Sequence, residues 1–99
     1  MPKLKLRFTT AAQRDLNDIF EYLEPRNSLA ANSVINAIEH SVNLLTEYPM
    51  SARRTDVEDV RVKSLTKYPF LIFYHAGNTE LTILRVWHSS REWPDELNE

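Results

Sequence analysis

The chain has 99 residues, of which 42% are hydrophobic and 26% charged, values typical of one ordinary globular domain rather than a disordered or fibrous protein. Its single glycine, Gly77, excludes a glycine-rich phosphate loop, and the lack of cysteine excludes disulfides and thiolate metal sites. The net charge of −2 gives no overall attraction to nucleic acid or membranes, and no signal peptide or membrane span is found. We expect a cytoplasmic protein of one domain, residues 1–99, without a metal or other cofactor.

The charged residues are distributed unevenly along the chain. Residues 1–59 hold seven Lys/Arg and nine Asp/Glu (−2), residues 60–91 hold five and one (+4), and residues 92–99 hold four acidic residues alone (−4). A basic region beside an acidic tail predicts a cationic face that suits an acidic partner or a phosphate backbone. The alternative is that these charges form ordinary solvated strand faces.

The first half of the chain predicts a strand followed by a helical hairpin. Residues 1–8 form the predicted strand. Polar and apolar residues alternate along its second half, so that Leu4, Leu6 and Phe8 point inward. Thr10 and Gln13 fit a capping box that begins a helix over residues 11–24, and Pro25 ends it. The apolar positions of this helix are Leu16, Ile19, Phe20 and Leu23.

A second, longer helix follows a short link and completes a hairpin over residues 10–48. Asn27 or Ser28 is its N-cap, and Pro49 ends it. Its predicted buried stripe consists of Val34, Ile38, Val42 and Leu45, with Ile35 and Leu44 beside it.

The second half predicts three antiparallel strands. Residues 50–59 are polar and aperiodic, hence a loop, and apolar segments follow at 60–65, 70–76 and 81–88, a meander over residues 60–88. Residues 70–74 are apolar at every position, which predicts a strand covered on both faces. In the last strand, alternation predicts Leu84, Val86 and His88 on one face and Ile83, Arg85 and Trp87 on the other. Residues 89–99 form a C-terminal extension. The predicted order βααβββ is α+β, with the hairpin packed on a small, twisted antiparallel sheet.

This order, with the residues that punctuate it, resembles the RelE/ParE superfamily of bacterial type II toxins. The resemblance covers nearly the whole chain and is most specific over residues 83–92. It rests on Ala11, Asp15, Leu16, Ile19, Tyr22 and Leu23 in the first helix, Ala30–Ala31, Leu45, Tyr48–Pro49, Arg61, the run 68–74 and Ile83–Glu92. The resemblance implies a small cytoplasmic toxin of the kind linked to plasmid stabilisation. It also implies that a cognate antitoxin neutralises the toxin by forming a hetero-oligomer with it.

The resemblance also implies where the antitoxin binds. Such antitoxins, often ribbon-helix-helix proteins with a disordered tail, lie along the helical hairpin and the sheet. Leu23 and Leu29 are the candidate apolar contacts, and Arg61 and Lys63 are candidates for ion pairs with an acidic tail. An open sheet edge is a second candidate, because its unpaired backbone groups accept an added strand.

Two arms of the superfamily differ in their targets. RelE-like members cut messenger RNA on the ribosome with a set of cations, and ParE-like members poison DNA gyrase. Alignment on Tyr74 puts Val62, Ser64 and Leu71 where the RelE pattern has two lysines and an arginine, although Arg91 matches a late RelE arginine. Losing even one group that stabilises transition-state charge typically costs about 2.7–4 kcal/mol. The long hairpin and the Val-Trp-His ending also resemble the ParE arm.

The sequence leaves three functions open. The favoured one is a gyrase-poisoning toxin without catalytic residues, whose target contacts are Arg85, His88, Arg91 and Trp93. The second is a ribosome-dependent mRNA endoribonuclease that uses His88 and Arg91 with Arg61 and Lys63. The third is a degenerate toxin that retains only antitoxin binding. Each candidate also has a structural interpretation: His88 as a strand cap, Arg61 and Lys63 as solvated, Arg85 stacked on Trp87, and Asp15, Asp18, Glu21 and Glu24 as a solvated helix face.

Overall fold

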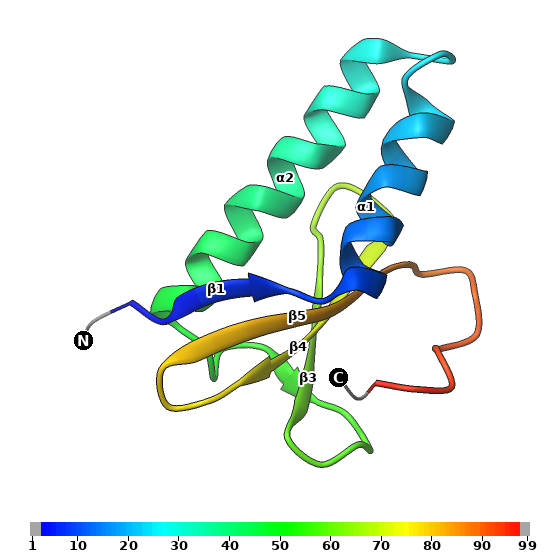
Figure 1. Cartoon of the computed structure of the whole chain (residues 1–99). Helices are drawn as coiled ribbons and strands as arrows, with labels where there is room; N and C mark the ends of the chain where they lie inside the picture. The colour runs from blue at the N-terminus through cyan, green and yellow to red at the C-terminus, as the bar shows by residue number, and fades with distance from the viewer. Residues whose placement is uncertain (1–2, 98–99) are drawn as a thin grey trace.

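A computed structural model describes residues 3–97, so residues 1–2 of the predicted first strand and 98–99 of the extension lie outside the described part. The element order is βαα followed by four strands (Figure 1), and the α+β prediction is confirmed. The elements are β1 (Lys5–Phe8), α1 (Thr10–Leu23), α2 (Ser28–Glu47), β2 (Arg53–Arg54), β3 (Val60–Ser64), β4 (Phe70–Ala76) and β5 (Glu80–His88).

The strands form one five-stranded sheet in the order β1-β5-β4-β3-β2. The predicted meander is confirmed, because β3, β4 and β5 pair antiparallel in turn. The sheet is mixed rather than antiparallel throughout, since β1 pairs parallel with β5. Alternating polarity identifies a strand but carries no information on the direction of its neighbour. The predicted loop over residues 50–59 also contains β2, whose two residues pair antiparallel with β3.

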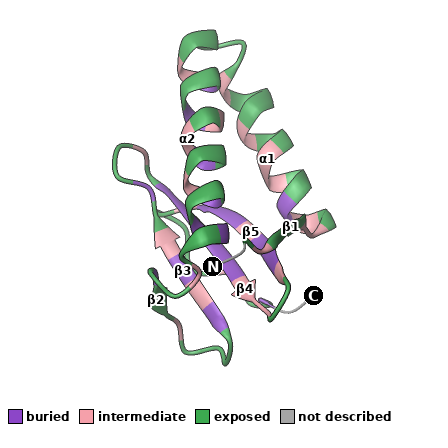
Figure 2. Cartoon of the chain, turned by 90° about the vertical axis from the view of Figure 1, so that its left-hand side faces the viewer, coloured by how far each residue is buried: buried purple, intermediate pink, exposed green. Residues whose placement is uncertain are grey.

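The two helices cover one side of the sheet, which we call the first face (Figure 1). The predicted stripe of α2 is confirmed, because Val34, Ile38, Val42 and Leu45 are all buried there. They pack against Ile72, Tyr74, Leu81, Ile83 and Val86 of the sheet. Figure 2 shows the resulting pattern, with buried residues along the strands and on the inward side of the helices, and exposed residues outside.

The caps of the two helices are set by side chains. Of the two predicted caps of α2, Asn27 is the one observed, because its side chain accepts a hydrogen bond from Ala30 N. The N-cap of α1 is Thr9 and not Thr10, so the predicted capping box is wrong. The Thr9 hydroxyl accepts from Ala12 N at 3.0 Å and donates to the carbonyl of Leu84 at 2.9 Å. This second bond, to a residue 75 positions away, is a tertiary contact that a local capping pattern does not include.

The opposite side of the sheet, which we call the second face, carries its own apolar cluster. Its members are Val60, Val62, Leu71, Phe73, Leu84, Trp87 and Leu97. Leu97 belongs to the segment 89–97, which we call the C-terminal strap. The strap leaves the end of β5 and returns along the side of the sheet away from the helices (Figure 1). Both faces of β4 are therefore covered, as its uninterrupted apolar run predicts.

A β-bulge in β5 changes which of its residues share a face. Phe73 pairs with Arg85 while the next residue, Tyr74, pairs with Ile83, so Leu84 is the extra residue. Ile83 and Val86 accordingly lie in the first-face cluster, and Leu84 and Trp87 in the second-face cluster. The predicted alternation is confirmed for residues 85–88 but is wrong for Ile83 and Leu84, because the extra residue moves each of them to the opposite face.

Several apolar residues that were expected inside are partly exposed. Leu6 on the edge strand β1 is 37% exposed, and Phe20 on α1 is 38% exposed. In α1 only Ala12 is fully buried. The hairpin extends well beyond the sheet in Figure 1, so its distal turns have no sheet beneath them to bury a wide apolar stripe.

Candidate target-binding surface

Asp15 of α1 completes the edge of β5 where β1 ends. The last paired residue of β1 is Phe8, opposite Ile83. Beyond it, the carboxylate of Asp15 accepts a hydrogen bond from Val86 N at 3.0 Å. The same carboxylate receives the guanidinium of Arg85 through two bonds, 2.7 Å from Nε and 2.9 Å from Nη2. Asp15 is thus a structural cap that accepts three hydrogen bonds from two residues, and its interpretation as part of a solvated helix face is wrong for this residue.

Arg85 is held in place by this carboxylate. Its hydrogen bond to Asp15 raises the pKa of the guanidinium, although burial acts in the opposite direction. The side chains of Arg85 and Asp15 are only 27% and 11% exposed, so the pair is largely withdrawn from solvent. Two-pronged pairing of this kind gives geometric specificity as well as energy. The positive charge of Arg85 is therefore already matched within the molecule.

Trp87 is the residue that brings two of the predicted target contacts together. Its ring is buried, and the guanidinium carbons of Arg85 and Arg91 lie 4.7 Å and 3.9 Å from the ring centroid. Both distances are within the range of a cation–π interaction. Arg91 is exposed, in contrast to Arg85. It is therefore the cation of this cluster that a partner molecule can reach.

His88 lies on the other face of the sheet from this cluster. It pairs with Phe70 across β4, and the two rings meet edge to face with centroids 5.3 Å apart. Its Nδ1 accepts a hydrogen bond from Ser90 N at 3.1 Å and also lies 2.7 Å from the Ser90 hydroxyl. Because a backbone N–H can only donate, Nδ1 is the acceptor of the bond from Ser90 N. The half-buried imidazole thus shapes the turn after β5.

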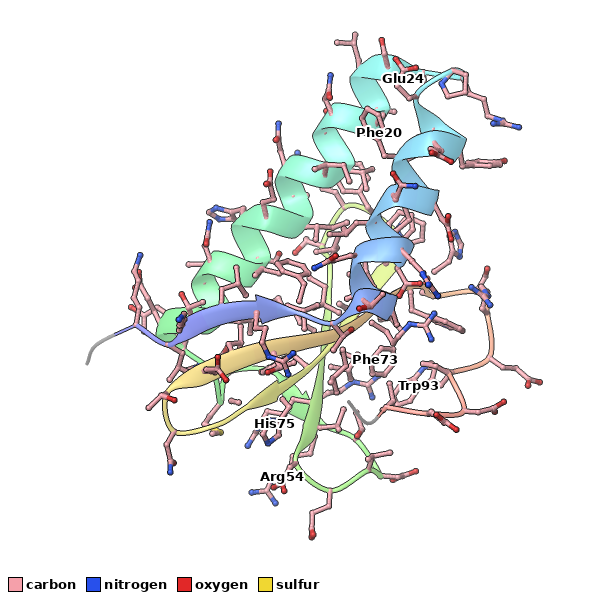
Figure 3. The ribbon with its side chains drawn as sticks, viewed as in Figure 1. Phe20, Glu24, Arg54, Phe73, His75 and Trp93 are labelled. Carbon is pink, nitrogen blue, oxygen red and sulfur yellow. The ribbon has the colours of Figure 1, made fainter. Side chains whose placement is uncertain are left out.

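Trp93 forms a second aromatic contact on the second face. Its ring meets Phe73 edge to face at 5.1 Å, and the Arg53 guanidinium carbon lies 5.4 Å from its centroid. Figure 3 shows Phe73 and Trp93 close together beneath the sheet, from β4 and the strap respectively. Trp93 is 41% exposed, so it is both an anchor of the strap and part of the molecular surface. Arg53 was not singled out in the sequence, because nothing local links it to a residue 40 positions away.

Arg61 has a structural role on β3. Its guanidinium donates to the carbonyl of Ala52 at 2.7 Å, which fastens the segment after α2 to the sheet. Tyr74 reinforces this attachment, because its hydroxyl donates to the carbonyl of Pro49 at 2.6 Å. Burial is the main cause of the raised pKa of Tyr74. Lys63 lies next to Arg61 on the same face of β3 and is half-buried.

The four residues of the alternative nuclease site do not form one cluster. Arg61 and Lys63 are on β3, two strands from β5, which corresponds to about 10 Å at ordinary strand spacing. Their cross-strand partners Tyr74 and Ile72 belong to the first face. The contact between Arg91 and Trp87 is on the second face, and His88 faces Phe70 on the first.

The positions where the RelE pattern has cations gather on the second face. Val62 and Leu71 are both buried in its apolar cluster, and Ser64 pairs directly with Leu71. Among residues 3–97, no group of three or more His, Cys, Asp or Glu is arranged to hold a metal ion. This part of the sheet therefore holds two buried apolar side chains and a serine where the RelE pattern would concentrate positive charge.

The candidate antitoxin contacts are spread over two regions. Leu23 ends α1 and is half-buried, and Leu29, in the first turn of α2, is 78% exposed at the tip of the hairpin. Arg61 and Lys63 are on the sheet. Other exposed apolar side chains also lie along the hairpin and its exit: Phe20, Tyr22, Leu44, Tyr48 and Met50. In Figure 3, Phe20 lies between the distal turns of the two helices. Within the described chain, no helix is both long enough and apolar enough to cross a membrane.

Comparisons with known proteins agree with this fold. The profile of the family described as "ParE toxin of type II toxin-antitoxin system, parDE" matches residues 6–93. A relative from Sinorhizobium fredii (strain NBRC 101917 / NGR234), named "Putative toxin Y4kP", is 33% identical over 97 residues, which is 98% of this chain and 100% of the relative.

Two solved toxin–antitoxin structures are similar to this chain. One chain of the chromosomal ParDE system from P. aeruginosa superposes with a TM-score of 0.76 at 24% identity, covering 87% of this chain and 96% of that one. One chain of the toxin–antitoxin complex RelBE2 from Mycobacterium tuberculosis superposes with a TM-score of 0.58 at 25% identity, covering 88% and 99%. With the family profile extending over most of its length, the chain belongs to the ParE toxin family of type II toxin–antitoxin systems.

Proposed function

We propose that this toxin inhibits growth by binding and poisoning DNA gyrase rather than by cutting RNA, and that a cognate antitoxin neutralises it in the cytoplasm. The observation that carries the proposal is the apolar second face. Val62 and Leu71 are buried in its cluster where a RelE-type ribonuclease has cations. Cleavage of a phosphodiester develops negative charge that apolar side chains cannot stabilise.

The proposed gyrase contact is the exposed end of β5 with the strap: Arg91, Trp93 and His88, with Arg85 as their support. Arg91 is exposed and stacked on a fixed ring, and Trp93 is partly exposed. Arginine and tryptophan are the residue types that most often dominate protein–protein binding energy. Arg85 contributes indirectly, because its pairing with Asp15 leaves it to position Trp87.

A supercoiling assay with purified gyrase tests the proposal. The toxin should inhibit supercoiling, and Arg91→Ala should weaken inhibition by at least about tenfold, in the range of a moderate interface hot spot. Arg26→Ala is the matched control, because Arg26 also stacks on an aromatic ring, Tyr22, at 4.0 Å, but at the tip of the hairpin. Circular dichroism must show that both variants are folded. Equal loss of inhibition in both would contradict the proposed contact.

The second candidate, a ribosome-dependent mRNA endoribonuclease, is favoured by one local feature. His88 and Arg91 belong to the same turn, since Arg91 N donates to the carbonyl of His88 at 3.2 Å. Histidine and arginine are residue types suited to acid–base chemistry on a phosphodiester, although here the two side chains lie on opposite faces of the sheet. Primer extension on translated message separates the candidates. Cleavage at defined codons that His88→Ala abolishes would replace the gyrase proposal, and uncut message with inhibited gyrase would remove the nuclease.

For the antitoxin we propose contacts along the hairpin and at the sheet, with a ribbon-helix-helix partner whose tail is disordered when free. Leu29 is exposed enough to lose most of its surface on binding. Leu29→Ser should therefore weaken the complex by about tenfold while leaving the fold unchanged. Co-purification and titration with the product of the neighbouring reading frame measure the affinity of the complex.

Expression of the toxin without that partner tests the third candidate function, a degenerate toxin that retains only antitoxin binding. Unimpeded growth would indicate such a degenerate toxin.

A further inference from the structure

Four side chains make a continuous series of contacts from α1 to the strap, which we call the arginine stack. The carboxylate of Asp15 binds Arg85, the Arg85 guanidinium lies over the ring of Trp87, and Arg91 lies over the same ring. Asp15 is on α1, Arg85 and Trp87 are on β5, and Arg91 is on the strap. Each link of the stack is a direct contact, so a change at Asp15 can reach Arg91 without the two residues touching.

The inner members of the stack are fixed, whereas its outer end depends on them. The Asp15 side chain is 11% exposed, and the buried ring of Trp87 is held by its Nε1 bond of 2.9 Å to the carbonyl of Glu92. Arg91 is exposed, and within residues 3–97 no carboxylate pairs with its guanidinium. The Trp87 ring, 3.9 Å away, is therefore what locates the Arg91 guanidinium.

Two cations share this one ring. The guanidinium carbons of Arg85 and Arg91 are 4.7 Å and 3.9 Å from the ring centroid. They can be no farther apart than the sum of these distances, which is below the Debye length of about 10 Å at 0.1 M salt. Like charges at such a separation repel each other. The Asp15 carboxylate balances the charge of Arg85 through bonds of 2.7 Å and 2.9 Å, and so reduces this repulsion.

We propose that Asp15 is a positioning residue for the target contact. It holds Arg85 beside Trp87 and balances its charge, and it thereby sets where the guanidinium of Arg91 meets the partner molecule. This inference rests on the proposed function in one respect, because it takes Arg91 as a contact of the target. The role is separate from the capping of β5, which uses only the bond that Asp15 accepts from Val86 N.

The variant Asp15→Asn separates the two roles. An asparagine keeps one side-chain oxygen, which can still accept from Val86 N where Oδ2 does so now. Its amide nitrogen at the place of Oδ1 cannot accept from Arg85 Nη2, and the negative charge is lost. Asp18→Asn is the matched control, because it is the same substitution at an exposed site of the same helix. Arg85→Lys is the second variant, since lysine leaves the cap in place but lacks the planar fork that binds both carboxylate oxygens.

A double-mutant cycle measures whether Asp15 acts through Arg91. Inhibition of gyrase supercoiling is compared for the wild-type chain, Asp15→Asn, Arg91→Ala and the double variant, at a temperature where circular dichroism shows all four folded. We expect Asp15→Asn to weaken inhibition about fivefold in the wild-type chain and less than about twofold in the Arg91→Ala background, because coupled residues are not additive. Asp18→Asn should have no effect in either background. Equal losses from Asp15→Asn in the two backgrounds would overturn the proposal.

A nuclear magnetic resonance measurement tests the same role without any target. Protons over the face of an indole ring are shielded, so the side-chain protons of Arg91 should resonate upfield of their ordinary positions. We expect Asp15→Asn and Arg85→Lys to remove most of this upfield shift, and Asp18→Asn to keep it. A wild-type shift of the Arg91 protons in both of the first two variants would overturn the proposal.

The two measurements distinguish failure of this inference from failure of the proposed function. A wild-type chain that does not inhibit gyrase contradicts the proposed function, and the Arg91 proton shifts then decide whether Asp15 positions that side chain. Inhibition by the wild-type chain with additive losses contradicts the positioning role alone. Should Asp15→Asn fail to fold, Arg85→Lys takes its place in the cycle, with the same results expected.

Discussion

The two faces of the sheet show two ways of covering the same set of strands. On the first face, helices of 14 and 20 residues bring Val34, Ile38, Val42 and Leu45 onto β4 and β5. On the second face, nine residues without regular structure reach the sheet through Trp93 and Leu97. The first cover is part of the fold, since its backbone groups are satisfied within the helices. The second rests on side-chain anchors, so the two faces should differ in stability and in access to partners.

The largest effect is expected in the first-face core. Ile38 is 1% exposed, and Ile38→Ala should lower the free energy of unfolding by about 3 kcal/mol, through lost burial and the cavity left behind. Urea denaturation followed by far-UV circular dichroism measures this loss. Leu97→Ala is the comparison on the second face and should cost clearly less, because the strap can detach without unfolding the sheet. Equal losses would show that the two faces form one cooperative unit.

A smaller but substantial effect is expected at Asp15, which connects the two faces. It joins α1 to Val86 N and to the Arg85 side chain that flanks Trp87. Asp15→Ala leaves a backbone donor and a guanidinium without their acceptor. The loss should be about 2 kcal/mol, less than for a fully buried pair because Arg85 is partly solvated. Asp18→Ala, on the exposed side of the same helix, is the control and should change stability by less than about 0.5 kcal/mol.

Tyr74 gives the first face a dependence on high pH. Burial raises its pKa, so the protonated phenol is the form that the folded state favours. Its contribution is fully present below the pKa of an unfolded tyrosine, about 10, and is lost as pH rises through the higher folded-state value. Tyr74→Phe should cost about 1 kcal/mol through the hydrogen bond to Pro49 and should reduce the decline in stability above about pH 10. Denaturation at several pH values measures this, and Tyr22→Phe, at an exposed site, should keep the wild-type decline.

The smallest effect is expected at the hydrogen bond that holds the strap. Trp87→Phe removes the bond from Nε1 to the carbonyl of Glu92 and keeps an aromatic ring in the cluster. Global stability should fall by only about 0.5 kcal/mol, since water can replace the donor at an exposed carbonyl. Hydrogen exchange should nevertheless speed up across residues 92–97 while the protection of β4 stays unchanged. Faster exchange throughout the sheet would mean that the strap stabilises the whole fold.

Much of this molecule could be predicted from local patterns. The α2 stripe follows the helical period over twenty residues, and all four of its predicted positions are buried. The run 70–74 identified β4 as a strand covered on both faces, because only such a strand can be apolar at every position. Asn27 was recognisable as a cap since its hydrogen bond to Ala30 N spans three residues. Each of these signals lies within a few residues along the chain.

What was missed depends on contacts between distant residues. The bulge at Leu84 arises from the pairing of β4 with β5, and it moves Ile83 to the first face and Leu84 to the second. The N-cap moved to Thr9 because its hydroxyl also meets Leu84. Asp15 had the appearance of one more surface carboxylate, and only the end of β1 beside β5 creates the unpaired groups that it binds. The grouping of Arg85 and Arg91 on Trp87 follows from the same geometry.

The amino-acid sequence by itself determined the two helices, four of the five strands and the buried stripe of α2, because periodicity and caps act over short stretches of chain. The tertiary structure alone decided the direction of β1, the capping of β5 by Asp15 and the return of the strap over a face without helices. These features depend on backbone and side-chain groups far apart in the chain, which become neighbours only when the sheet has formed.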